Sequence, residues 1–150
     1  MKLLAFAAST SSTSINRQLI DYATRLLDAG LVDDVEIDTI DLIDDEMPIY
    51  SIDRQNELGI PRAAHDFFDK IGAADAVLFS TSTGPGGGTN VLSTAVMSGQ
   101  FFGYDVAASL AIPSFHDNFD TDTGTLSNHE LDAQFRAALT TLNDPVGVPA

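Results

Sequence analysis

The stretch Ser9-Thr10-Ser11-Ser12-Thr13-Ser14-Ile15-Asn16 decides how the rest of the chain is interpreted. It follows an apolar run, Lys2 to Ala8, that predicts a strand buried on both faces. From Ser14 to Gly30 the apolar residues recur at helical spacing. The stretch is therefore predicted to be a strand-to-helix turn.

Such a turn suits a phosphate group, because the first N–H groups of a helix lack partners and the helix dipole favours an anion there. We predict that it binds the phosphate of a cofactor through three serine hydroxyls and two backbone N–H groups, those of Ser9, Ser11, Ser14, Ile15 and Asn16. Arg17 would add a positive charge beside these groups. The alternative is a serine-rich loop in which Ser14 only caps the helix.

Length and charge limit the classes of function. A chain of 150 residues is expected to form one domain, residues 1–150. The net charge of −15, with only seven Lys and Arg, argues against nucleic acid or an anionic membrane as partner. The chain has no cysteine and its three histidines are scattered, so no metal site is expected. With no signal peptide or membrane span expected, the prediction is a cytoplasmic protein.

Working outward from the turn, strands alternate with helices, which predicts a parallel α/β sheet. A half-exposed edge strand is expected around Val35 to Ile40, a buried strand at Ala76 to Phe79, and a last strand from Tyr104 to Ile112. Ligands of such folds bind beyond the carboxyl ends of the strands. The loops after the first three strands should therefore share one rim.

The motifs in these loops resemble the NADPH-dependent FMN reductase family, a flavodoxin-like group of flavin enzymes. The resemblance rests on four motifs in the family's order, together with a capped last helix. The motifs are Ala8 to Asn16, Met47-Pro48-Ile49-Tyr50, Ser82-Thr83-Gly84-Pro85-Gly86-Gly87-Gly88 with Asn90-Val91-Leu92, and Pro113 to Phe119. The resemblance implies a three-layer α/β/α fold that binds FMN and uses NAD(P)H.

The resemblance also implies contacts with the flavin ring. Pro48, Ile49 and Tyr50 would touch the edge of the ring, and the further cofactor-binding residues would be Thr81, Ser82 and Gly84. For Pro48 to Tyr50, a plain surface turn is an equal alternative. The glycine-rich loop Gly84 to Gly88 is either a flexible connector or a close backbone approach to the flavin.

One departure from the family pattern changes the expected sheet. Ala76 to Ser82 runs directly into the glycine-rich loop, without the helix and strand that relatives have between them. We therefore expect about four strands instead of five, with apolar surface left uncovered. A homo-oligomer is one way to cover that surface.

The expected function is an FMN-binding oxidoreductase that uses NAD(P)H to reduce flavin. Electrons would then pass to a small-molecule acceptor such as free flavin or a quinone. Because the flavin carries the chemistry, no catalytic side chain is predicted. The alternatives are a flavodoxin-like electron carrier and a shortened, catalytically silent family member.

Overall fold

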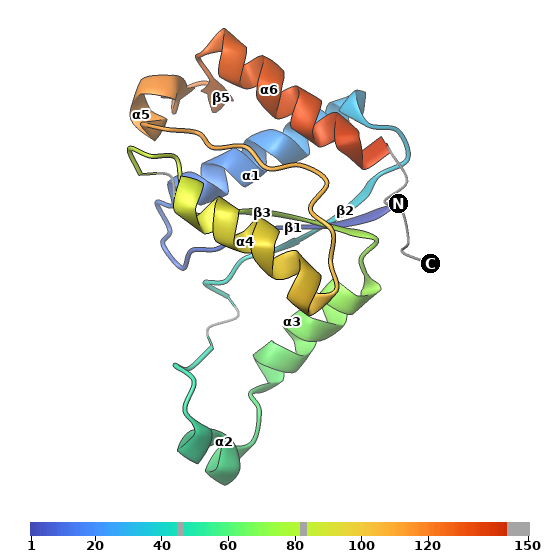
Figure 1. Ribbon diagram of the computed structural model, residues 1–150, viewed down its shortest axis with the longest axis vertical. Coiled ribbons are helices and arrows are strands. Elements are labelled where there is room, and N and C mark those ends of the chain that lie inside the picture. Colours follow the sequence, from blue (N-terminus) through green and yellow to red (C-terminus); the bar gives the residue numbers. More distant parts are fainter. Residues whose placement is uncertain (45–46, 82–83, 144–150) are drawn as a thin grey trace.

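The computed structural model describes residues 1–44, 47–81 and 84–143 (Figure 1). Its helices and strands alternate through the first two thirds of the chain, and a short hairpin and a helix follow. Here η1 is a π-helical turn and η2 a 3-10 turn. The elements are β1 (Lys2–Ala7), α1 (Ile15–Leu26), η1 (Leu27–Leu31), β2 (Glu36–Ile40), α2 (Ile52–Leu58), α3 (Arg62–Ala73), β3 (Ala76–Ser80), α4 (Thr89–Phe102), α5 (Phe115–Asn118), β4 (Phe119–Asp120), β5 (Thr125–Leu126), α6 (His129–Thr140) and η2 (Thr141–Asn143).

A parallel sheet in the order β2-β1-β3 forms the centre of the fold. Leu3 of β1 is in register with Ile37 of β2 and Ala76 of β3, so all three strands end at the same edge. The hairpin β4–β5 is antiparallel and separate from this sheet. The predicted α/β class is confirmed. The predicted number of strands is wrong, because the described sheet has three strands rather than four.

The two faces of β1 contact different helices, because successive side chains of a strand point to opposite faces. Leu3 packs in a buried cluster with Ala23 of α1, Leu27 of η1 and Leu139 of α6. Phe6 makes an edge-to-face contact with Phe67 of α3, with ring centroids 5.2 Å apart. The sheet is therefore covered by α1 and α6 on one face and by α3 on the other, as a three-layer fold requires (Figure 1).

A second buried cluster attaches the C-terminal part of the chain to α1. Tyr22 of α1 stacks on Phe135 of α6 with centroids 5.5 Å apart, and Phe115 and Phe119 stack at 4.6 Å. The other buried residues of this cluster are Leu19, Ile112 and Leu126. The cluster holds α5, the hairpin and α6 against α1.

Tyr22 also carries a polar link within this cluster. Its hydroxyl donates a hydrogen bond to Asp132, and Arg136 donates to the same hydroxyl at 3.0 Å and to Asp132 at 2.8 Å. Burial, and then the bond to Asp132, raise the pKa of Tyr22. For Asp132, desolvation acts to raise the pKa, but the bonds from Tyr22 and Arg136 outweigh it and hold the pKa below its usual value.

The predicted strand from Tyr104 to Ile112 is not formed. Its first residue is tied to α4, where the Tyr104 hydroxyl donates to the Ala95 carbonyl at 2.8 Å. Its last residue, Ile112, is buried in the second cluster. Both ends are thus anchored to other parts of the chain, to α4 and to the second cluster. An apolar run becomes a strand only where it finds a backbone partner.

The burial predicted for β3 is wrong on one face. Leu78 packs toward the first cluster, but Val77 and Phe79 are 42% and 43% exposed. A continuous apolar run predicts a strand covered on both faces. In this chain nothing among the described residues pairs with the outer edge of β3, and the face bearing Val77 and Phe79 is only partly covered.

Candidate functional site

The predicted turn lies where expected, between β1 and α1. Ser14 is the N-cap of α1, and its Oγ accepts from the Arg17 N–H at 3.3 Å. Ser14 is also the one buried polar residue of the described core, at 8% exposure. Its hydroxyl oxygen is thus engaged by the helix, as the capping interpretation requires.

The other hydroxyls of the turn remain at the surface. Ser9 Oγ accepts from the Ser11 N–H at 3.3 Å, and Ser11 Oγ lies 3.3 Å from Thr13 Oγ1. Ser11, Ser12 and Thr13 are exposed, whereas Ser9 is half-buried. Each hydroxyl in these contacts keeps further hydrogen-bonding capacity. The turn therefore presents several neutral groups to a ligand beside the N-terminus of α1.

The backbone donors of Ile15 and Asn16 belong to the first turn of α1. Within residues 1–44, 47–81 and 84–143 no acceptor takes either N–H, as expected for the start of a helix. The Asn16 side chain is engaged, since its Oδ1 accepts from Ser80 Oγ at 3.2 Å. This bond joins the start of α1 to the end of β3.

The end of β3 lies beside the turn. The Ala8 N–H donates to the Ser80 carbonyl at 2.8 Å, so half-buried Thr81 follows directly next to the end of β1. The structure thus brings Thr81 together with the serine turn. Ser82 lies outside the described residues. Ser80 was not among the predicted site residues, and the only signal for it was its position at the end of the strand.

Arg17 does not face the turn as a free cation. Its guanidinium forms an ion pair with Asp41, which directly follows β2, and Asp41 also accepts from the Ile43 N–H at 3.1 Å. The pair brings the end of β2 to the start of α1. Asp41 was missed because a single acidic residue after a strand is an unspecific signal.

The predicted ring-binding segment Pro48-Ile49-Tyr50 is not brought to the turn. Ile49 and Tyr50 are 89% and 74% exposed. The Ile49 carbonyl accepts from the Arg54 side chain of α2 at 2.9 Å. Figure 1 shows this segment extending away from the sheet toward α2. The structure therefore favours the surface-turn interpretation in this conformation, and the ring contact stays a prediction.

The glycine-rich loop is explained by packing within the chain. Gly87 has φ +61°, and a Cβ placed there would lie 2.8 Å from Pro113 N and 2.9 Å from the Ile112 backbone. The close approach required of a glycine is thus made to the 112–113 backbone. Gly84 at the start of the loop is exposed and has open space around it.

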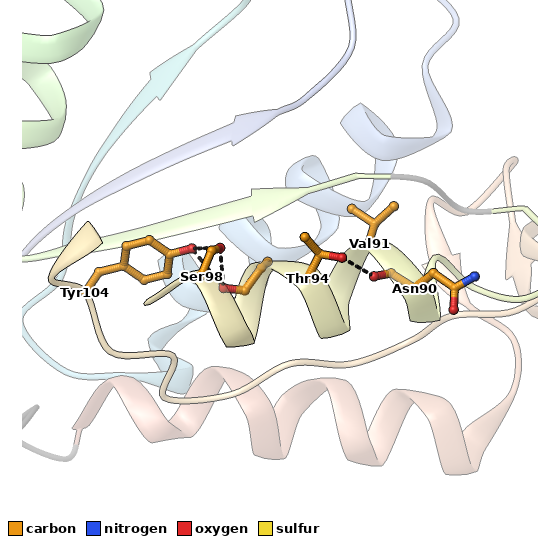
Figure 2. Close-up of a pocket in the computed structure, with 6 residues that line it drawn as sticks. Asn90, Val91, Thr94, Ser98 and Tyr104 are labelled. Carbon is orange, nitrogen blue, oxygen red and sulfur yellow. Dashed lines mark hydrogen bonds between the residues drawn. The ribbon is translucent and has the colours of Figure 1, made fainter. Parts of the chain in front are cut away.

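A shallow groove of about 420 Å³ runs along α4 and ends at Tyr104 (Figure 2). Its hydroxyls are used locally: Thr94 donates to the Asn90 carbonyl at 2.9 Å, and Ser98 donates to the Ala95 carbonyl at 3.0 Å. No charged residue lines the groove, so it lacks the cationic donors that bind a phosphate most strongly. It is not the predicted cofactor site.

The described part of the chain shows neither a metal centre nor a membrane-spanning helix. No group of three or more His, Cys, Asp or Glu side chains is placed to hold a metal ion there. No helix in those residues combines the length and apolarity needed to cross a membrane.

Comparison with known proteins gives a family match over the N-terminal part of the chain, which holds β1, β2, β3 and the serine turn. The family model described as NADPH-dependent FMN reductase matches residues 1–96. Among curated proteins, none matches the chain. The family match covers more than half of the sequence and includes the turn, the sheet and the glycine-rich loop. The chain therefore belongs to the NADPH-dependent FMN reductase family.

Proposed function

We propose that this chain binds FMN and uses NAD(P)H to reduce it, with electrons passing on to free flavin, a quinone or another small acceptor. The observation that carries the proposal is the serine turn at the N-terminus of α1, within the matched residues. Bound flavin would supply the hydride and electron transfer chemistry. The role of the chain is to hold the phosphate and orient the cofactor.

The turn fits a phosphate in spite of the acidic chain. Ser9 and Ser11 offer hydroxyls, and Ile15 and Asn16 offer N–H groups at the positive end of the α1 dipole. Asp41, an acidic side chain near the start of α1, is paired with Arg17, which reduces its repulsion of an anion. Thr81 completes the set at the end of β3.

The phosphate role is tested by comparing FMN with riboflavin, which lacks the phosphate. Both are titrated into the flavin-free chain and into Ser11→Ala, with calorimetry as the measurement. We expect the variant to bind FMN about tenfold or more weakly, since a hydrogen bond to a charged group contributes roughly 1.5–3 kcal/mol. Riboflavin affinity should not change.

The matched control is Ser51→Ala, which removes a serine from the N-cap of α2, away from the turn. It should leave the FMN affinity unchanged. Equal affinities of the wild-type chain for FMN and riboflavin would contradict phosphate binding at the turn.

The redox part is tested separately by following NAD(P)H absorbance with FMN present. Turnover with free flavin or a quinone supports the reductase. FMN binding without NAD(P)H oxidation would instead indicate the flavodoxin-like electron carrier. A folded chain that binds no FMN would indicate the silent family member, and the exposure of Ile49 and Tyr50 is the observation that favours this outcome.

A further inference from the structure

The outer edge of β3 is an unpaired strand edge that bears no charge. Ala76–Ser80 pairs with β1 on one side, and no described residue pairs with it on the other. The opposite edge of the sheet, β2, carries Glu36 and Asp38, and Asp38 is paired with Lys70 at 3.1 Å. Charged side chains are a common protection of edge strands against association. Only β2 has that protection.

The uncharged character continues beyond β3. Residues 76–112 contain one charged residue, Asp105, in a chain with 22 Asp and Glu. This segment also carries nine of the exposed large apolar side chains. They are Val77, Phe79, Val91, Val96, Met97, Phe101, Phe102, Tyr104 and Val106. Each copy of the chain carries a net charge of −15, so the electrostatic repulsion between two copies is smallest when they meet through this nearly uncharged segment.

The chain's own extended segment, residues 104–112, forms no strand with this edge. Tyr104 is tied to α4 through Ala95 and Ser98. At the other end the backbone of Ile112 lies against Gly87, and the Ile112 side chain is buried in the core. Among residues 1–44, 47–81 and 84–143 no segment pairs with this edge, so a partner from another chain has access to it.

We propose that a second copy of this chain pairs with the free edge of β3, antiparallel, across a two-fold axis at Leu78. In that register Val77 of each copy lies opposite Phe79 of the other, and both side chains are half-exposed on the same face. Aromatic residues opposite β-branched residues are favourable cross-strand pairs. The contact is self-complementary, as a closed dimer requires, and produces one continuous six-stranded sheet. It is independent of the flavin.

The first test is sedimentation of the flavin-free chain over a low to high micromolar concentration series. We expect a species of twice the 15.9 kDa chain mass. The double variants Val77→Lys with Phe79→Lys, and Val77→Glu with Phe79→Glu, place like charges opposite each other. Each should raise the dimer dissociation constant by more than about tenfold.

An equimolar mixture of the two variants should associate again, because every Lys then faces a Glu. This recovery excludes misfolding as the cause of the loss. The control is Leu58→Lys, which charges a side chain that is 74% exposed on α2, a helix distant from the sheet (Figure 1), and it should leave the dimer intact. A wild-type monomer throughout, dimeric like-charged variants, or no association in the mixture would each overturn the proposal.

A second measurement does not depend on the variants folding. Hydrogen exchange of the β3 amides is followed in the wild-type chain at low and high concentration. Protection that rises with concentration supports the pairing. Weak protection at both concentrations overturns it, and strong protection in a chain that sediments as a monomer would mean that a segment of the same chain covers the edge.

Discussion

Replacing Gly87 with alanine tests whether the glycine-rich loop is fixed by packing within the chain. An added Cβ would lie 2.8–2.9 Å from backbone atoms of Ile112 and Pro113, closer than real Cβ contacts occur. The backbone at these positions is fixed by the buried side chains of Ile112 and Phe115, so removing the clash requires part of the core to move.

The magnitude follows from two contributions. The left-handed backbone, φ +61°, costs an alanine about 1–2 kcal/mol. Forcing extra volume into a packed site adds about 1–3 kcal/mol. Gly103→Ala is the matched control, because Gly103 is also left-handed, at φ +73°, but has nothing within 4 Å of the added Cβ. It should carry the first cost only.

The assay is urea unfolding of the wild-type chain and both variants, followed by far-UV circular dichroism. We expect Gly87→Ala to lose about 1–3 kcal/mol more unfolding free energy than Gly103→Ala, at similar m-values. Equal losses in the two variants would refute the reasoning, because they would show that the loop moves freely away from residues 112–113.

Three further predictions concern the polar link and the caps. Tyr22→Phe removes the hydroxyl shared by Asp132 and Arg136, and thermal unfolding should show a loss near the lower end of about 1.5–3 kcal/mol. The pKa of Asp132 is lower in the folded chain than in the unfolded chain, so the ionised carboxylate stabilises the fold above its unfolded pKa, near pH 4. This stabilisation is lost as the pH falls through the folded pKa. In urea unfolding across this range, the free energy of unfolding of Asp132→Asn should therefore fall less steeply with pH than that of the wild-type chain. Asn128 is the N-cap of α6, and its Oδ1 accepts from the N–H groups of Glu130 and Leu131. Ser14→Ala and Asn128→Ala each remove an N-cap acceptor and should each cost about 0.5–2 kcal/mol in urea unfolding, whereas unchanged midpoints would contradict the capping contacts.

The sequence alone was sufficient for the features that depend on local patterns. The apolar run of β1, the helical spacing after Ser14 and the alternation in β2 correspond to observed elements, because each pattern is set by the geometry of its own segment. Ser14 caps α1 as the hydroxyl at a helix start predicts. The alternation of strands and helices gave the parallel α/β class, and the loop motifs gave the family.

The tertiary structure alone decided which of these segments meet. Nothing local distinguishes Tyr104 to Ile112 from a strand, and only its anchoring at both ends keeps it out of the sheet. The pairing of Arg17 with Asp41 and the bond between Ser80 and Asn16 join residues 24 and 64 positions apart. A strand partner, an ion pair and the exposure of Val77 and Phe79 all depend on what the rest of the chain places alongside, and no pattern within one segment contains that information.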